Sequence, residues 1–295
     1  MDQPPRDLYQ RVTDQIIAAI EAGAGEYRMP WNPRLCTSAE VGIPHNPVGG
    51  YAYRGINILG LWASQQAAGY ETAHWATFRQ WQAVGAQVRK GEKGSLTIFF
   101  KPIEKETKDS AAEGDGADGP RRSGFIIRAA WVFNSAQVEG YLPRLKAPLP
   151  MIERMDVAEG LLAASKARFI HDGPEACYVP SRDEIHLPPP GAFRDSPAFY
   201  GVAFHELIHW TGHESRCARD LRARFGSEAY AAEELVAELG AAFMAAAVGI
   251  APEPRTDHAG YIEGWLRALR NDKRAIFTAA AKASQAADYL IGLAD

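Results

Sequence analysis

Two histidines four residues apart enclose a glutamate in the run His205-Glu206-Leu207-Ile208-His209. On a helix, residues four apart lie on the same face, so both imidazoles can direct a nitrogen at one ion about 2 Å away. Glu206 lies beside them, where it can take a proton from a water that the ion activates without binding the ion itself. The pattern predicts a metallopeptidase-type zinc site, with manganese or cobalt as alternative metals.

A catalytic zinc site needs three protein ligands and an open position, so a third ligand must come from elsewhere in the chain. Glu234 and Glu238 are four residues apart on a second predicted helix. One can bind the ion while the other hydrogen-bonds the ring nitrogen of a histidine ligand that faces away from the ion. We predict that Glu234 binds the ion and that Glu238 hydrogen-bonds a histidine ligand, although helical symmetry leaves the exchanged assignment open.

His213 is a further alternative for the third ligand. If the motif helix continued, His213 would lie about 12 Å from His205 along the axis. It could bind the same ion only if the chain turned back sharply after Gly212. Glu234 therefore remains the preferred ligand.

The elements that must position these residues are mostly helical. Ser196-Pro197 predicts the start of the motif helix, with serine as N-cap and proline at the first helical position. The second helix is expected at about 227–248, and one or two more at 258–290. At the start of that last region, His258 and Tyr261 are candidate donors to the oxyanion that forms during peptide hydrolysis.

The other expected elements follow from apolar periodicity and turn residues. They are helices at about 8–23, 57–68 and 77–85, strands at 95–101 and 125–133, and a hairpin of 177–179 with 185–187. Residues 104–123 mix charge and small residues and are assigned no structure. The proline-containing segment 145–150 predicts a linker. The expected fold is therefore α+β with two domains, residues 1–147 and residues 151–295.

The chain has a net charge of −4, and its charged residues are distributed unevenly between the two halves. Residues 1–150 hold 17 Lys and Arg against 15 Asp and Glu, and six of those acids and two lysines lie within 104–118. Without that stretch the N-terminal half has 15 basic against 9 acidic residues, or +6. A basic domain followed by an acidic one is typical of a nucleic-acid-binding module joined to another function.

Aromatic and basic residues alternate over 75–101 in the N-terminal half, as in proteins that stack single-stranded bases on aromatic faces beside a cationic groove. A tryptophan stripe at helical spacing is also typical of a core, so both interpretations stay open for Trp75 and Trp81. The candidate DNA-binding residues are Tyr53, Arg54, Trp75, Arg79, Arg89, Lys90 and Lys93.

Membrane insertion and secretion are both disfavoured by the sequence. No apolar run reaches the eighteen or so residues that a membrane span needs, and the first residues lack the layout of a secretory signal. The three cysteines are far apart and form no Cys-x-x-Cys pair. Together these features predict a cytoplasmic protein.

Several runs resemble the ArdC family of plasmid antirestriction proteins. They are His205 to His213, Glu233 to Gly240, Tyr53-Arg54-Gly55-Ile56-Asn57, Thr77-Phe78, and Val88 to Gly94. The resemblance covers nearly the whole chain except 104–123. It implies a domain that binds single-stranded DNA, then a zincin-like metallopeptidase domain in which His205, His209 and Glu234 bind the metal and Glu206 is the base. It also implies a role in shielding conjugating DNA from restriction enzymes.

The expected fold is thus a basic α+β domain that binds single-stranded DNA, followed by a mostly helical zincin-like domain with a small sheet. Two functions remain open. The protein could coat transferred single strands, or it could be a DNA-directed protease that cleaves host proteins bound there. Glu206 favours the second, because a purely structural metal site needs no carboxylate beside its ligands.

Overall fold

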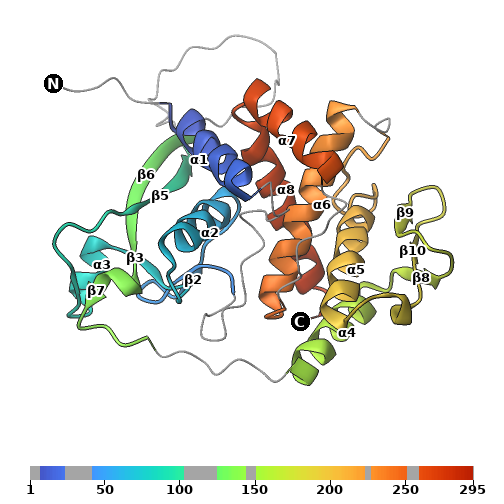
Figure 1. Cartoon of the computed structure of the whole chain (residues 1–295), viewed down its shortest axis with the longest axis horizontal. Coiled ribbons are helices and arrows are strands. Elements are labelled where there is room, and N and C mark those ends of the chain that lie inside the picture. Colours follow the sequence, from blue (N-terminus) through green and yellow to red (C-terminus); the bar gives the residue numbers. More distant parts are fainter. Residues whose placement is uncertain are drawn as a thin grey trace, which may run out of the picture.

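The computed structural model describes residues 7–23, 42–102, 125–143, 151–222, 227–250 and 259–294 (Figure 1). The helices of these ranges are α1 (Leu8–Gly23), α2 (Ile56–Ala68), α3 (Phe78–Ala83), α4 (Met151–Ser165), α5 (Ser196–Thr211), α6 (Glu228–Ala247), α7 (Ala259–Asn271) and α8 (Ala275–Ile291). None of these helices is long and apolar enough to cross a bilayer.

The strands within the described ranges lie in four small sheets. They are β1 (His45–Asn46), β2 (Tyr51–Ala52), β3 (Trp75–Thr77), β4 (Gln87–Val88), β5 (Ser95–Pro102), β6 (Phe125–Asn134), β7 (Val138–Glu139), β8 (Arg168–His171), β9 (Cys177–Val179) and β10 (Glu184–Leu187). Helices and small sheets occur in both halves, which confirms the α+β prediction.

A three-stranded antiparallel sheet of order β3-β6-β5 forms the centre of the N-terminal half. The long strands β5 and β6 pair from Ser95 with Val132 to Pro102 with Phe125. Helix α2 is joined to this sheet through Asn57, whose side-chain amide donates to the Ile98 carbonyl at 2.9 Å and whose side-chain oxygen accepts from the Ile98 N–H at 2.8 Å. These two partly buried bonds fix α2 on one face of the sheet.

The C-terminal half is a helical layer with a small sheet beside it. Helices α5 and α6 lie side by side, α8 packs along α6, and the sheet β8-β10-β9 packs beside α5 (Figure 1). Small residues on α8, among them Ala280, Ala283 and Ala287, are fully or nearly fully buried. Their size lets α6 and α8 approach closely.

The two halves share one apolar core. Helices α1 and α2 pack against α7 and α8, and Thr13 of α1 donates a hydrogen bond to the carbonyl of Lys273 at 2.8 Å. Gly55, at the start of α2, donates its N–H to the Ser284 hydroxyl at 2.9 Å. The boundary between residues 1–147 and 151–295 stays a prediction, because the expected linker at 145–150 lies outside the described residues, as does the stretch 104–123.

Most element predictions are confirmed, including the hairpin of β9 and β10 and the helix that Ser227 caps. Thr77 caps α3 in a reciprocal arrangement with Gln80. The predicted N-cap of the motif helix is wrong by one residue. Asp195 is the cap, and its carboxylate accepts from the N–H of Ala198 at 2.8 Å, so Ser196 is the first helical residue.

Candidate metal centre

Helix α5 places the two motif histidines one turn apart on the same face. Both side chains are largely buried, and their ring centroids are 4.9 Å apart. The surrounding α5 residues Phe204, Leu207 and Ile208 are fully buried in the core. The apolar residues of α5 thus anchor the helix and leave its histidine face turned towards α6.

Helix α6 faces α5 at unusually short range. A Cβ added to Gly240 would lie 2.7 Å from the Cδ1 atom of Ile208, which is closer than carbon atoms approach. Glycine at this position therefore lets Ile208 pack directly on the α6 backbone. This close approach brings the buried carboxylates of Glu234 and Glu238 up to the histidines.

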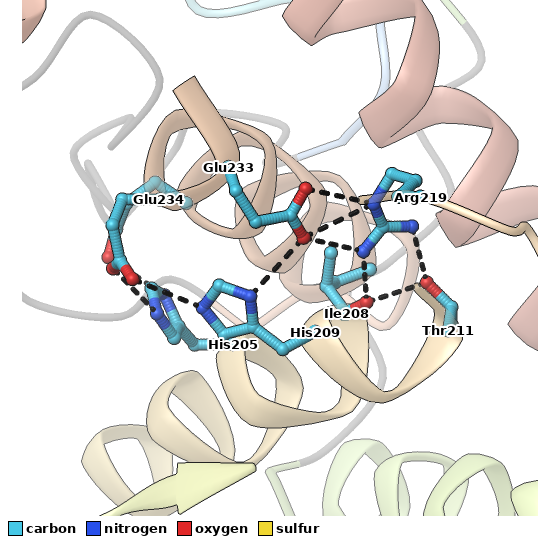
Figure 2. Close-up of polar contacts among 8 residues, drawn as sticks. His205, Ile208, His209, Thr211, Arg219, Glu233 and Glu234 are labelled. Carbon is cyan, nitrogen blue, oxygen red and sulfur yellow. Dashed lines mark hydrogen bonds and ion pairs between the residues drawn. The ribbon is translucent and has the colours of Figure 1, made fainter. Parts of the chain in front are cut away.

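Glu234 lies opposite both imidazoles (Figure 2). Its Oε2 is 3.5 Å from Nε2 of His205, and its Oε1 is 3.5 Å from Nε2 of His209. One ligand atom from each of the three residues lies within 4.8 Å of the others. Two imidazole nitrogens and one carboxylate oxygen around a common point fit a zinc-type ion with an open fourth position.

The outer nitrogen of each histidine faces a further carboxylate. Nδ1 of His205 lies 3.0 Å from Oε1 of Glu238, where the sequence placed the supporting glutamate. Nδ1 of His209 lies 3.3 Å from Oε1 of Glu233, which the sequence analysis missed. Carboxylates in these positions orient the imidazoles so that Nε2 remains free for a metal.

Arg219 completes the support behind His209 (Figure 2). Its Nη2 donates to Glu233 Oε1 at 2.9 Å and to the Ile208 carbonyl at 2.6 Å, and its Nη1 donates to the Thr211 hydroxyl at 2.9 Å. Arg219 therefore joins Glu233 of α6 to the last turn of α5. No spacing rule predicts this residue, because it comes from the irregular segment after the helix.

The charges of the centre are strongly coupled. Burial alone would lower the pKa of His205, but Glu234 and Glu238 outweigh it and raise that pKa to about 10. Burial likewise acts to raise the pKa of Glu234, yet the hydrogen bond from His205 and the charges of both histidines hold it below its usual value. An ionised, buried carboxylate facing two imidazole nitrogens is an environment that favours a cation.

Glu206, the candidate base, is buried on α5 next to the two ligands. The hairpin strand β9 packs beside α5, the helix that carries Glu206, and burial and then the Glu206 charge raise the pKa of the Cys177 thiol in that strand. The β9–β10 turn is fixed to the segment after α5 by Arg216, which donates to Asp183 Oδ2 at 3.0 Å and lies 3.7 Å from the Trp210 ring centroid. The hairpin thus packs against the helix that carries Glu206.

The remaining candidates for this centre have different outcomes. His213 is outside the ligand group, and its Nδ1 contacts the Ser215 hydroxyl at 2.8 Å instead. His258 lies outside the described residues. Tyr261 is in α7, but its side chain is not among those described, so the proposed oxyanion role of both residues stays a prediction.

Two of the expected DNA-stacking residues are buried, which corrects their assignment. Trp75 is fully buried, and Tyr53 is buried beside it with its hydroxyl donating to the Trp75 carbonyl at 3.0 Å. Trp81 is also fully buried, and its indole N–H donates to the Phe133 carbonyl at 3.0 Å. Trp75 lies on strand β3 and Trp81 on helix α3, in two separate apolar clusters, so the expected helical stripe does not form and none of these rings can receive a base.

The basic candidates divide into two groups. Arg54 pairs with Asp288 of α8, and Arg89 donates to Glu92 at 2.9 Å and to the Ala136 carbonyl at 2.6 Å. Arg79, Lys90 and Lys93 are exposed. The exposed aromatic residue next to them is Phe78, which together with the turn 89–92 lines a cavity of about 610 Å³.

Two family models match the chain. One, described as the N-terminal domain of the anti-restriction factor ArdC, matches residues 6–133. The other, described as a zincin-like metallopeptidase, matches residues 156–282 and so includes all residues of the metal centre.

Relatives match over almost the whole chain. Protein y4eC of Sinorhizobium fredii is 47% identical over 288 residues, covering 98% of this chain and 92% of y4eC. DNA primase TraC of Escherichia coli is 37% identical over 301 residues, but this chain spans only 28% of TraC. Crystal structures of the antirestriction protein ArdC from plasmid R388 are 38% identical, with 98% of both chains covered. The TM-score is 0.78 for the metal-free form and 0.77 for the Mn(II)-bound form.

Proposed function

This chain belongs to the ArdC antirestriction family and carries a zincin-like metallopeptidase domain. We therefore propose that it binds single-stranded DNA and hydrolyses peptide bonds at a divalent metal. In this proposal it protects DNA that enters a bacterial cytoplasm by conjugation. The observation that carries the enzymatic part is the convergence of His205, His209 and Glu234, with Glu206 beside them.

Zinc is the proposed metal, with manganese as an alternative because Mn(II) is bound in the R388 relative. Such an ion supplies Lewis acidity, which polarises a carbonyl and makes water more acidic. His205, His209 and Glu234 would hold the ion, and Glu238 and Glu233 would keep the two imidazoles in the orientation that this requires. Glu206 accepts the proton of the attacking water and delivers it to the departing amine.

An extended peptide is the substrate class that suits the hairpin beside α5. Strand β9 is an edge strand, since within the described residues the sheet order is β8-β10-β9. The free N–H and carbonyl groups of an edge strand can pair with an extended chain. A peptide paired with β9 would run beside α5, the helix that carries Glu206, because β9 packs against that helix.

The proposed DNA surface differs from the sequence-based one in its aromatic residues. Phe78, 40% exposed, takes the stacking role expected of Trp75, and Lys90 and Lys93 supply charge from the adjoining turn. Trp131, exposed on β6, extends the aromatic surface from the same face as Phe133, whose ring centroid lies 6.5 Å from that of Phe78. Stacked bases and neutralised phosphates are the two contacts that single-strand binders combine.

A second function deserves testing because of Glu206. A protein that only coats DNA needs no buried carboxylate beside its metal ligands, whereas a protease directed to DNA-bound host proteins does. In that alternative, proteolysis is the primary activity and antirestriction is its consequence. The DNA surface would then serve to bring the metal centre to its targets.

The deciding experiment is an antirestriction assay of Glu206→Gln beside wild type. An unmodified plasmid is conjugated into a restricting and a non-restricting recipient, and transfer efficiencies are compared. Loss of protection with full metal content and unchanged DNA affinity would support proteolysis as the working activity. Retained protection would support DNA coating alone and refute the need for chemistry.

A further inference from the structure

A second cavity, of about 550 Å³, lies between α4, β8 and the N-terminal end of α5. It is separate from the metal centre. Tyr200, which lines it, is nine residues before His209 on α5, and nine residues of a helix make about two and a half turns. The cavity and the metal centre therefore lie on opposite faces of α5.

Aromatic rings form much of its wall. The ring centroids of Phe193 and Phe199 are 5.4 Å apart at 81°, and those of Phe199 and Tyr200 are 5.2 Å apart at 74°. Phe169 of β8 completes the lining on the other side. Edge-to-face rings present both faces and edges to a cavity, and the faces carry partial negative charge.

Two carboxylates, the imidazole of His171 and no lysine or arginine accompany these rings in the cavity lining. Glu159 accepts a hydrogen bond from the Tyr200 hydroxyl at 2.6 Å through Oε1, and within the described residues it has no cationic partner. The Asp195 carboxylate accepts hydrogen bonds from the Ala198 N–H at the start of α5 and from Nε of Arg194 at 3.0 Å. Its negative charge is therefore balanced by Arg194 and by the positive N-terminal end of the helix. Glu159 is left as the uncompensated charge.

We propose that this cavity receives the guanidinium of an arginine side chain on a partner protein. Aromatic faces attract cations, and a planar guanidinium stacks on a ring while donating to a carboxylate. Phosphates and other anions are repelled by Glu159. The mouth is formed by exposed residues such as Glu159, Asp195 and Ser196, so a side chain can enter while its backbone remains outside.

Neither the metal centre nor the DNA surface contributes a residue to this cavity, so the proposal is independent of the proposed function. Its volume exceeds that of one guanidinium and lies within the range of about 300–1,000 Å³ that is common for ligand sites. The aliphatic stem of arginine can fill the remaining space against Leu162 and the phenylalanine rings. The partner is therefore a protein that presents an exposed arginine.

The test uses the zinc-loaded full chain and two capped amino acids, acetyl-arginine amide and its uncharged isostere acetyl-citrulline amide. Saturation-transfer NMR titrations give an affinity for each probe. We expect the arginine probe to bind at least about fivefold more tightly, given the strength of cation–aromatic contacts. Equal affinities would overturn the proposal, and so would binding of free L-arginine without binding of the capped form.

Variants locate the binding. Glu159→Gln keeps an acceptor for the Tyr200 hydroxyl, so it should fold and lose the preference for arginine over citrulline. Phe193→Ala, at a half-buried ring, should weaken both probes. Glu214→Gln removes an exposed charge elsewhere and should change neither affinity. Unaltered arginine binding in both Glu159→Gln and Phe193→Ala would refute this cavity as the site.

Discussion

The guanidinium of Arg219 holds both carboxylate oxygens of Glu233, with Nη2 2.9 Å from Oε1 and Nε 3.1 Å from Oε2. The same Oε1 lies 3.3 Å from Nδ1 of His209 (Figure 2). The side chains of Arg219 and Glu233 are only 4% and 12% exposed. A buried ion pair thus acts as the support behind one histidine of the metal centre.

Arg219→Gln should weaken zinc affinity by about 10–100-fold, because supporting residues of this kind contribute that much to metal binding. It should also destabilise the protein by about 3–5 kcal/mol, since the Glu233 carboxylate loses its buried partner. Chelator competition and thermal unfolding measure the two effects. The matched control is Arg222→Gln, whose exposed pair with Asp220 should matter little. Equal behaviour of the two variants would contradict the role of Arg219.

Glutamine variants of three of the four glutamates at the centre should differ in their metal content. Glu234→Gln should lose the ion, because it removes the carboxylate that faces both Nε2 atoms. Glu238→Gln should retain the ion with reduced affinity, and Glu206→Gln should retain it fully. Elemental analysis of the purified variants decides this. A full complement of metal in Glu234→Gln would shift the ligand role to another residue.

Gly240→Ala should lower both the stability of the protein and its zinc affinity, although Gly240 does not contact the ion. The added methyl group would meet Ile208 at 2.7 Å, so α5 and α6 must separate or Ile208 must change rotamer. Overpacking of this kind costs about 1–3 kcal/mol, and the shift should also lower zinc affinity.

Gly264→Ala in α7 is the control for the Gly240 variant. Its new methyl group would lie an ordinary 3.8 Å from Ala231, and alanine favours a helix interior by about 1 kcal/mol over glycine. This variant should be as stable as wild type or more so. If thermal unfolding ranked the two variants equally, the close approach at Gly240 would not be a constraint.

Asp183 should make the stability of the hairpin depend on pH. Its hydrogen bonds from Arg216 hold its pKa below the usual 3.8, against the opposing effect of burial. A lowered folded-state pKa means that the stabilisation is present above the unfolded value, about 3.9, and is lost as the pH falls through the folded value.

Asp183→Asn should therefore lower the Tm at pH 7, and the difference from wild type should shrink below about pH 4. The residue has a φ of 53°, a left-handed conformation that asparagine tolerates, so the variant removes charge without straining the backbone. Thermal unfolding at several pH values checks this. A Tm difference that stayed constant from pH 7 to pH 3 would exclude the charge as its cause.

Phe78 and Trp75 should respond in opposite ways to replacement by alanine. Phe78→Ala should weaken single-stranded DNA binding by about 1–3 kcal/mol with little change in Tm, because an exposed ring contributes by stacking. Trp75→Ala should destabilise the fold by about 3–5 kcal/mol, because it removes a buried ring. Fluorescence anisotropy with an oligonucleotide and thermal unfolding separate the two.

Salt dependence provides the control for the same surface. Each neutralised phosphate of a single strand contributes about 0.7 to the slope of log affinity against log salt. Replacing both Lys90 and Lys93 with alanine should reduce that slope by about 1.4, whereas Phe78→Ala should leave it unchanged. An unaltered slope in the double variant would remove the turn from the DNA site.

The local features of this protein could be predicted from its sequence. The spacing of His205 and His209 determines a shared helical face, because the helix repeat depends only on neighbouring residues. The helix starts at about residues 77 and 227 and the β9–β10 hairpin were predictable for the same reason. Their geometry depends on a few consecutive residues, and the structure confirms them.

Only the tertiary structure decided how distant segments meet. Spacing cannot distinguish Glu234 from Glu238, because the approach of α5 and α6 depends on Gly240 and Ile208. Arg219 supports the centre from an irregular segment that has no periodicity to analyse. A tryptophan at helical spacing serves equally in a core or on a surface, and packing against the rest of the chain buried Trp75 while leaving Phe78 exposed.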